Sequence, residues 1–491
     1  ITARFEAGFP ANGRTINSGE LIKILFDFLP RCVKHVFYFK NRKPEEVLSV
    51  IHLAEDQQFI RRELERLDLV SFVADKAVLP RESGISSRPM KGSVPFSSPQ
   101  SLRTELDLPH HGRLTGMGLR RGITLIVGGG YHGKSTLLKA LEAGVYNHVA
   151  GDGREYVITD STAMKLRAED GRSIQNTDIS LFINDLPNKK NTKCFSTEDA
   201  SGSTSQAAAV IEGIEAGSRA FLIDEDTSAT NFMVRDDLMQ KIISRSKEPI
   251  TPFIERARDL YENAGISTIM VAGSSGAYFY IADTIIQMDC YEPLDITDKT
   301  KAFCASYGAE PITRAPGFAL PARGRKLQTG TSTSGLSNSG LSASGRSGQS
   351  QNAQPEEHGK GGYRQGGSYG RGRGGRDGAR GGYGSQGGRE ERIKVKVYGK
   401  DSLQVGKSPV DLRFVEQLID PEQTNALAQM LRYCVEHQLL ERYTVADTVT
   451  LLEKEIKKGG ITAVSDTSYA ACGLCMPRTQ EIFACINRYR G

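Results

Sequence analysis

The sequence predicts an α/β fold whose core is a mostly parallel sheet flanked by helices. Two observations predict it. From Arg113 to about Pro316, apolar runs of strand length alternate with helical runs, which is the order of elements in a parallel sheet. One of these strand-to-helix steps holds the pattern G-x-x-x-x-G-K-S of a phosphate-binding loop. Ligands of such sheets bind at the C-terminal ends of the strands, where we expect the functional site.

The 491 residues exceed a single hydrophobic core, so we expect several domains. Residues 1–110 predict a small N-terminal α/β domain, and residues 111–316 predict the nucleotide-binding core. Residues 320–392 are rich in Gly, Ser and Arg and predict a disordered insertion. Residues 393–491 predict a mainly helical C-terminal region that packs on the core.

Within the N-terminal domain we expect an amphipathic helix from Ser18 to Leu29, a strand from Val33 to Lys40 and a charge-laced helix from Glu45 to Leu67. In the C-terminal region, Pro421 stands near a helix start, and a further helix is expected from Val445 to Lys457. The sequence has no run of ~20 apolar residues, the length that spans a bilayer, so we expect no membrane partner.

A glycine-rich loop follows the apolar strand Ile123 to Val127 and precedes a Leu/Ala-rich helix. The residues expected to bind ATP are Gly128, Gly129, Gly130, Tyr131, His132, Gly133, Lys134, Ser135 and Thr136. Backbone N–H groups of such a loop surround phosphate oxygens, which glycine permits because it has no Cβ. The helix N-terminus adds a partial positive charge. Lys134 is expected to reach the β- and γ-phosphates, as a catalytic group, and Ser135 to bind Mg²⁺.

A second apolar run, Ala220 to Ile223, ends in the acidic residues Asp224, Glu225 and Asp226. A P-loop ATPase needs one acid to hold the Mg²⁺ shell and another to orient or deprotonate water. Asp224 is placed for the first role and Glu225 for the second, catalytic one. Taken alone, the same residues could be a solvated acidic turn.

Small hydroxyl residues and a glycine open an Ala-rich helix that ends near Gly217. They could serve only as a helix N-cap. The segment also resembles the Ser-Gly-Gly-Gln signature of ABC-class ATPases, and Thr227 to Asn231 resembles their D-loop. The resemblance implies a head-to-tail homodimer in which the signature of one subunit contacts the γ-phosphate bound by the other. The signature residues would be Ser201, Gly202, Ser203 and Gln206.

Five runs make the resemblance more specific: Gly128 to Thr136, Gly144 to Glu155, Phe195 to Gln206, Ile223 to Phe232 and Glu248 to Phe253. They are similar to the family of predicted ABC-class ATPases, to which the ATPase of the kinetoplastid mitochondrial RNA-binding (guide-RNA editing) complex belongs. The resemblance implies an ABC-type core, ATP and Mg²⁺ as cofactors, and dimerisation. It also implies a mitochondrial role in RNA processing or editing, within an editing complex. Without the resemblance, we would expect a cytoplasmic protein.

The chain departs from the wider ABC pattern at three places. The histidine that normally follows the next apolar strand is missing after Ala272, so Gly273 or Ser274 stands where it would be. Gln175 is the only glutamine between Thr136 and Gln206, which leaves the usual Q-loop hard to place. The proline that commonly follows the aliphatic-to-acid step of that class is also missing. Nucleotide binding tolerates these changes, whereas we expect ATP hydrolysis to be slow.

Basic and aromatic residues recur in the glycine-rich part of the insertion, Gly359 to Gly388. The candidate RNA contacts are Arg364, Arg371, Arg373, Arg376, Arg380, Tyr363 and Tyr369. Guanidinium groups pair with phosphates and stack on bases, and tyrosines add stacking faces. We therefore expect this RGG-type segment to bind RNA with weak sequence preference and strong salt dependence. A flexible, solubilising linker is the alternative.

Three functions remain open, because a net charge of +5 does not separate them. An ATP-gated RNA-binding dimer accounts for the P-loop, the signature-like segment and the RGG segment together. An ATP-binding RNA scaffold with little or no hydrolysis accounts for the missing histidine. A P-loop small-molecule phosphotransferase needs neither the signature-like residues nor the RGG segment.

Overall fold

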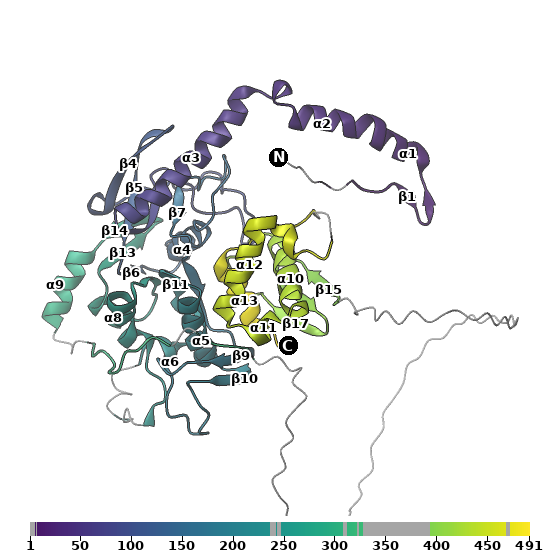
Figure 1. The fold of residues 1–491 in the computed structure, drawn as a ribbon. Helices are drawn as coiled ribbons and strands as arrows, with labels where there is room; N and C mark the ends of the chain where they lie inside the picture. Colours follow the sequence, from purple (N-terminus) through teal and green to yellow (C-terminus); the bar gives the residue numbers. More distant parts are fainter. Residues whose placement is uncertain are drawn as a thin grey trace, which may run out of the picture. The chain divides into compact units, whose positions relative to one another are not determined.

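A six-stranded sheet forms the centre of the fold in the computed structural model (Figure 1). Its strands, in spatial order, are β14 (Glu292–Asp295), β13 (Thr284–Asp289), β6 (Ile123–Val127), β12 (Ser267–Val271), β11 (Ala220–Asp224) and β8 (Met164–Leu166). All neighbours run parallel except β14, which is antiparallel to β13. The predicted mostly parallel sheet is therefore confirmed.

Helices pack on both faces of this sheet. Phe221 of β11 belongs to one hydrophobic cluster with α5 (Gly202–Glu215) and α8 (Phe253–Ala264), whereas its neighbour Leu222 belongs to another with α4 (Lys134–Ala143). Successive side chains of a strand point to opposite faces, so each strand contributes to both clusters. Nearly continuous burial of the strands is what parallel strands covered on both sides require.

A four-stranded antiparallel sheet lies before and around the P-loop in the sequence. Its strands, in spatial order, are β4 (Arg103–Leu108), β5 (Gly112–Arg120), β3 (Leu69–Ala74) and β7 (Val157–Thr159). Helix α3 (Pro44–Arg66) packs on it through Ile60 and Leu64, which confirms the helix expected from Glu45 to Leu67. Residue 110, where we expected a domain boundary, lies in the turn between β4 and β5, so this sheet continues into the expected core.

The N-terminal segment is helical where a strand was expected. Its elements are β1 (Ala11–Asn12), β2 (Thr15–Ile16), α1 (Ser18–Lys23), the π-helix η1 (Ile24–Phe28), α2 (Leu29–Phe37) and the 3₁₀ helix η2 (Phe39–Asn41). The predicted strand from Val33 to Lys40 is wrong. The helix capped by Asn17 continues through a π-turn, in which the N–H of Leu29 donates to the carbonyl of Ile24. A π-turn accommodates the following Pro30, which has no N–H to donate.

The C-terminal region has its own hydrophobic cluster. It contains the antiparallel strands β15 (Val395–Tyr398), β16 (Ser402–Val405) and β17 (Ser408–Asp411), then α10 (Pro421–Glu436), α11 (Leu439–Arg442), α12 (Val445–Gly459), the 3₁₀ helix η7 (Ile461–Val464) and α13 (Thr479–Arg488). The mainly helical region and its helix at Val445 are confirmed, and the small sheet was not expected. The region packs on the core as expected, since Gln417 donates to the carbonyl of Ala163 over 3.2 Å.

The structure describes residue 5 and residues 7–235, 242, 247–307, 312–321, 324–327, 393–467 and 472–491. The candidate RNA contacts between Tyr363 and Arg380 lie outside these residues. The remaining described elements are 3₁₀ helix η3 (Gln100–Leu102), strands β9 (Arg172–Thr177) and β10 (Phe195–Ala200), 3₁₀ helix η4 (Glu225–Thr227), α6 (Thr230–Met233), 3₁₀ helix η6 (Gly276–Tyr280) and α9 (Thr297–Tyr307). Among the described residues, no helix combines the length and the apolar character needed to cross a bilayer.

Candidate functional site

The glycine-rich loop connects β6 to α4 at the C-terminal end of the parallel strands. Gly128 has a φ of 140°, and a Cβ there would lie 2.4 Å from the carbonyl oxygen of Met288. Gly133 has a φ of 99° and caps α4. The ammonium group of Lys134 donates to the carbonyls of Gly128 over 2.6 Å and of Gly129 over 2.8 Å. The lysine therefore lies across the loop, next to the N-terminus of the helix where an anion is favoured.

The turn between β13 and β14 packs against the P-loop, which the sequence did not indicate. The N–H of Cys290 donates to Nδ1 of His132 over 2.9 Å, and the N–H of Tyr291 donates to the carbonyl of His132 over 3.1 Å. Asp289 lies 3.1 Å from the same Nδ1. His132 thus ties the loop to this turn, while Tyr131 is fully exposed with a φ of 64°. Together, His132, Asp289 and Cys290 place three potential metal-ligand atoms within 4.8 Å of one another.

The acidic strand end lies on the same sheet edge as the P-loop. Asp224 pairs with Val271 of β12, and Val271 pairs with Ile126 of β6. Strand spacing then puts Asp224 about 10 Å from Ile126 across one intervening strand. The carboxylate of Asp224 and the hydroxyl of the exposed Ser135 are oxygen ligands of the kind Mg²⁺ prefers. Together with the N-terminus of α4, which favours an anion, these groups fit a magnesium-bound triphosphate.

Glu225 is held by the loop that follows β12. Its carboxylate accepts from the N–H of Gly273 over 2.6 Å, from the N–H of Ser274 over 2.9 Å and from the Ser274 hydroxyl over 2.7 Å. Burial raises the pKa of Glu225, but these hydrogen bonds outweigh it and lower the pKa below its ordinary value. The residues that stand where the histidine was expected therefore contact the candidate catalytic acid directly.

The signature-like segment begins α5 and is hydrogen-bonded to the D-loop of its own protomer. Gln206 is fully buried: its side-chain N–H donates to the Ser228 hydroxyl, and its carbonyl accepts from the N–H of Ala229, each over 2.9 Å. The Ser203 hydroxyl donates to Asn231 over 2.6 Å. Ser203 and Gln206 lie one helical turn apart and therefore share the buried face.

Ser201 and Gly202 lie at the N-terminus of α5 and are accessible to solvent. Ser201 occupies the N-cap position without a side-chain capping bond, and its hydroxyl lies 3.0 Å from that of Thr204. Of the four signature residues, these two are therefore the ones accessible from outside the protomer. The carboxylate of Asp170 would lie 3.3 Å from a Cβ at position 202, so a larger residue there would crowd this surface.

A cavity of about 560 Å³ lies beside the P-loop and was missed in the sequence. Gly133, Thr136 and Lys139 line one side, and the segment from Leu79 to Phe96 lines the other. This segment is rich in Ser and Gly between residues 83 and 93. The cavity is next to the loop that would hold phosphates, so it offers room for the nucleoside part of the ligand.

The run from Gly144 to Glu155 supports the wall of this cavity. Arg154 Nε donates to the carbonyl of Leu79 over 2.9 Å, and Arg81 donates to the carboxylate of Asp152 over 2.8 Å. Burial and the nearby Arg81 charge lower the pKa of Arg154 to about 10. The side chain of Gln57 in α3 donates to the backbone carbonyl of Glu155 over 2.9 Å. The run from Gly144 to Glu155 therefore joins α3, the cavity wall and α4, and it does not supply a ligand at the P-loop.

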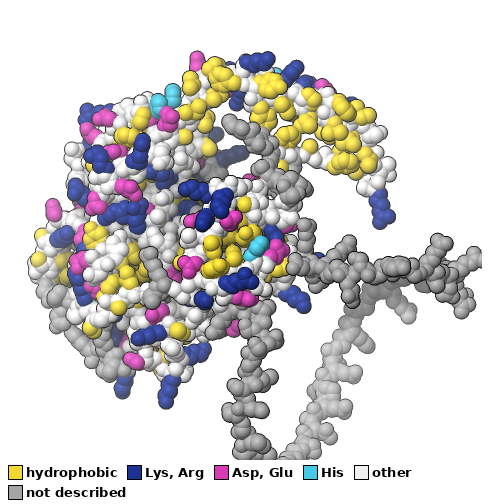
Figure 2. All heavy atoms as spheres, in the orientation of Figure 1, with side chains coloured by type: hydrophobic (Ala, Val, Ile, Leu, Met, Phe, Trp, Pro, Cys, Tyr) yellow, Lys and Arg dark blue, Asp and Glu magenta, His cyan; other side chains and the backbone are white. Residues whose placement is uncertain are grey.

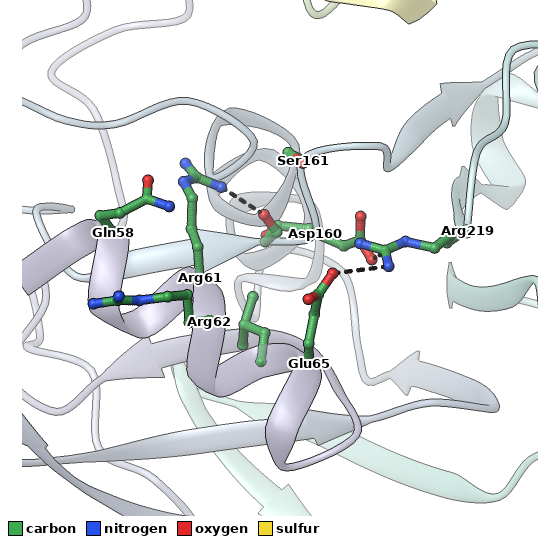
Figure 3. A pocket seen from close by; sticks show the side chains of 9 residues that line it. Gln58, Arg61, Arg62, Glu65, Asp160, Ser161 and Arg219 are labelled. Carbon is green, nitrogen blue, oxygen red and sulfur yellow. Dashed lines mark hydrogen bonds and ion pairs between the residues drawn. The ribbon is translucent and has the colours of Figure 1, made fainter.

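A second cavity, of about 310 Å³, lies at the opposite sheet edge, where β8 and β11 begin (Figure 3). Arg61 of α3 and Arg219 approach Asp160 from opposite sides of this cavity. Arg219 Nε lies 3.1 Å from the Asp160 carboxylate, and Arg121 donates to it over 3.0 Å. Arg219 also donates to Glu65 over 3.0 Å. These charges tie α3 to both sheets, far from the P-loop edge.

Gln175, the glutamine considered for a Q-loop, lies in β9 and donates to the carbonyl of Tyr489 over 2.9 Å. It therefore faces the C-terminal region in this structure. The structure places Asp224 at the same sheet edge as the P-loop, whereas the contacts of His132, the cavity wall and the Gln206 network involve residues far apart in the sequence.

Three family models match the chain. The P-loop domain model of ABC ATPases matches residues 43–319, the model described as "ATPase of the ABC class N-terminal" matches residues 1–40, and the "MRB1590 C-terminal domain" model matches residues 394–491. An uncharacterized protein of Methanocaldococcus jannaschii is 30% identical over 229 residues, which cover 45% of this chain and 50% of that protein. The chain therefore spans about half the length of this relative.

Solved structures of ABC proteins are also similar. One is cbiO1 of Clostridium perfringens, part of the ABC transporter complex cbiONQ, with a TM-score of 0.30 and 12% identity over 49% of this chain and 92% of that one. Another is a bacterial Atm1-family ABC exporter with ATP bound, with a TM-score of 0.29 and 14% identity over 50% of this chain and 42% of that one.

Proposed function

Because this chain belongs to the ABC-class P-loop ATPases, whose domain model covers residues 43–319, we propose that it is an ATP-gated RNA-binding factor. It acts as a head-to-tail homodimer in mitochondrial RNA processing or editing, as a component of an RNA-editing complex. The P-loop domain binds ATP, and in this proposal ATP binding controls the affinity for RNA. The observation that carries it is the accessible N-terminus of α5, which is hydrogen-bonded through the D-loop to the acidic strand end.

Nucleotide binding follows from the residues at the sheet edge. The loop N–H groups from Gly129 onwards and the N-terminus of α4 favour phosphate oxygens, and Lys134 neutralises their charge from its place across the loop. Ser135 and Asp224 supply the oxygen ligands for Mg²⁺, which neutralises charge on the phosphates when it is bound. The neighbouring cavity takes the nucleoside part of ATP.

Hydrolysis requires Glu225 to orient a water molecule. Its carboxylate is ionised and already accepts three hydrogen bonds from Gly273 and Ser274, so it is better suited to positioning water than to removing a proton from it. We therefore expect slow turnover. The same observation favours the second candidate function, an ATP-binding RNA scaffold that scarcely hydrolyses ATP.

The two halves of the proposed dimer communicate through side chains that the structure describes. Ser201 and Gly202 of one protomer contact the γ-phosphate held by the other. Within each protomer, Gln206 joins α5 to Ser228, and the Ser228 hydroxyl donates to the backbone carbonyl of Asp224 over 2.8 Å. Closure of the dimer over one nucleotide is thereby linked to Asp224, the metal-binding acid at the second nucleotide.

The C-terminal region is coupled to the same helix. Arg325 donates to Glu215 at the end of α5 over 2.7 Å and to Asn487 of α13 over 2.5 Å. Gln480 of α13 donates to the carbonyl of Ala216 over 3.2 Å. Movement of α5 on ATP binding would therefore move the C-terminal region, which directly follows the RGG segment in the sequence. This connection supports ATP gating of RNA bound by that segment.

The proposal is tested by measuring the affinity of a single-stranded RNA for the full chain with ATP and Mg²⁺, with ADP and without nucleotide, while phosphate release is followed. We expect a shift of about tenfold, or ~1.4 kcal/mol of coupling. Lys134→Ala, which removes the phosphate-neutralising charge, should abolish the shift. RNA binding with the same affinity in all three nucleotide states would favour the ATP-binding RNA scaffold. Absence of RNA binding would favour the small-molecule phosphotransferase. Mitochondrial location is tested separately by fractionating cells that express the tagged chain.

A further inference from the structure

The N-terminal arm, residues 7–41, has a wide apolar surface that nothing in the described structure covers. No residue of the arm is buried. Ten of its large apolar side chains are between 45 and 77% exposed. They are Phe9, Ile16, Ile22, Leu25, Phe26, Phe28, Val36, Phe37, Tyr38 and Phe39. Figure 2 shows hydrophobic side chains gathered along α1 and α2. Monomeric proteins rarely expose contiguous apolar surface of this extent, and such surfaces mark interaction sites.

The polar face of the arm carries two ion pairs between its own residues. Lys23 lies 2.8 Å from Glu20, and Arg31 lies 2.5 Å from Asp27. Asn17 accepts from the N–H of Glu20 and caps the helix. A helix of this length is marginally stable alone in water, because most helical stability comes from packing of an apolar face. The arm therefore has an apolar face that requires a partner.

We infer that the arm of one protomer pairs with the arm of a second copy of this chain, and that this contact forms without nucleotide. The inference rests on the proposed homodimer and adds an interface outside the ATP sites. A large or aromatic side chain carries roughly 200 Å², so ten that are about half exposed offer on the order of 1,000 Å² per arm. Two such arms would bury about 2,000 Å², the area typical of stable homodimers.

Two ion pairs on the polar face of the arm lessen its attraction to a membrane. Helices that lie on membranes have a polar face rich in Lys and Arg, whereas here Glu20 and Asp27 neutralise Lys23 and Arg31 and leave Arg14, Lys34 and Lys40 as the excess basic residues. RNA would contact the basic residues near the end of the arm, but its phosphates cannot cover Phe26 or Ile22. A second copy supplies an equally apolar surface, and two identical patches related by a two-fold axis are self-complementary.

Pairing of the arms would also affect the ATP sites. The arm leads directly into α3, where Gln57 and Arg61 hold the segment that follows α4: Gln57 donates to the carbonyl of His148 over 2.8 Å and Arg61 to Asn147 over 2.9 Å. Joined arms would keep two ATPase cores at high effective concentration, so that ATP-driven closure becomes an intramolecular step. The ATP-dependent contact between the two cores could then be weak by itself and still form.

The test is sedimentation equilibrium of the full chain without nucleotide, with the double variant Phe26→Asp/Phe28→Asp. We expect the wild type to dimerise and the variant to dimerise at least tenfold more weakly. The matched control is Ile85→Asp, because Ile85 is completely exposed but lies outside the arm; it should leave dimerisation unchanged. At a dilution that makes the wild type monomeric, its unfolding temperature should equal that of both variants, since neither changes a buried side chain.

A nucleotide-free wild-type monomer would overturn the inference, and so would a dimer that survives Phe26→Asp/Phe28→Asp. Binding of the monomeric wild type to vesicles of phosphatidylcholine and phosphatidylserine, lost in this variant, would also overturn it in favour of a membrane. Glu225→Gln with ATP separates the two interfaces. One outcome is that the wild type forms the arm dimer without nucleotide while ATP and Mg²⁺ do not make the Glu225→Gln dimer more stable. In that case the arm contact stands, and the ATP-dependent dimer of the proposed function fails.

Discussion

Glu225 is the side chain whose ionisation should govern the rate of ATP hydrolysis. Burial raises the pKa of its carboxyl group, but the hydrogen bonds from Ser274 and Gly273 outweigh burial and lower it. The carboxylate is therefore ionised at neutral pH, and its charge is lost only as the pH falls through this lowered pKa. Its contribution to folding stability follows the same sign: present above the pKa of the unfolded chain and lost in acid.

Removing the Ser274 hydroxyl should move this titration. In Ser274→Ala one donor to Glu225 is lost, so we expect its pKa to rise and the acidic limb of the pH–rate profile for ATP hydrolysis to shift to higher pH. The rate at neutral pH should change less than about tenfold, because one hydrogen bond contributes about 1 kcal/mol. Ser275→Ala is the matched control, since Ser275 donates its backbone N–H to Glu225. An unmoved acidic limb would show that another group controls it.

Asp160 is the acid on which the joint between α3 and the two sheets depends. Burial raises its pKa, but hydrogen bonds from Thr162 and the charges of Arg219 and Arg121 lower it overall. Asp160→Asn removes the buried member of this cluster and leaves Arg121 and Arg219 only their solvent-exposed partners Asp68 and Glu65, so we expect a loss of about 3 kcal/mol in the free energy of unfolding, measured by urea denaturation. The wild type should lose this contribution as the pH falls through the lowered pKa of Asp160.

The control for this prediction is Asp68→Asn, because Asp68 also faces Arg121, at 3.4 Å, but is mostly exposed. It should change the unfolding free energy much less, since ion pairs in contact with solvent are weak. Equal losses in the two variants would mean that burial does not strengthen the Asp160 contacts. ATP affinity should stay within about twofold in both, because this cavity lies at the sheet edge opposite the P-loop.

Among the secondary-structure elements, α5 and the D-loop should act as one unit because Gln206 connects them. Gln206→Leu keeps the size of the side chain but removes its bonds to Ser228 and Ala229. We expect ATP binding to a single protomer to persist, since the P-loop is untouched, while ATP-dependent dimerisation falls at least about tenfold. Gln206→Glu, which retains the acceptor for Ala229, should be intermediate. Full ATP-dependent dimerisation in Gln206→Leu would contradict the coupling.

Elements with a strong local pattern were predictable from the sequence. The run Ile123 to Val127 forms β6 as expected, and the apolar run before Asp224 forms β11. The segment from Val33 to Lys40 was not predictable in this way. Its β-branched and aromatic residues favour a strand locally, but the helix that starts after Asn17 continues through a π-turn and includes most of them. Local preference is weak compared with continuation of an established helix.

The parts of the site that sequence reasoning missed all depend on contacts between distant segments. His132 contacts a turn more than a hundred residues later, and Gln57 contacts the carbonyl of Glu155. No local pattern reports such a pairing. The inward orientation of Gln206 was missed for a related reason: the resemblance to a signature identified the residue, whereas only the three-dimensional position of the D-loop shows where its amide group bonds.

In the molecule as a whole, the C-terminal region is held to the signature helix by buried charge. Arg488 of α13 lies 2.5 Å from Glu169, and the N–H of Glu169 donates to the hydroxyl of Ser205 in α5. The guanidinium of Arg325 adds a second link, between Glu215 and Asn487. Buried ion pairs cost several kcal/mol to break when one partner is removed. The C-terminal region should therefore follow α5 when nucleotide binds.

The RNA prediction has two parts: the RGG segment binds RNA, and this linkage carries the nucleotide signal to it. The two parts can be tested separately. Deleting residues 359–388 should weaken binding of single-stranded RNA and flatten its salt dependence, because each phosphate contact contributes about −0.7 to the slope of log K against log salt. Replacing Arg364, Arg371, Arg373, Arg376 and Arg380 by Lys should keep most of that slope and lose the affinity that comes from stacking. The deletion should leave ATP binding unchanged. A salt slope unaltered by the deletion would instead place the RNA site on the folded regions of the chain.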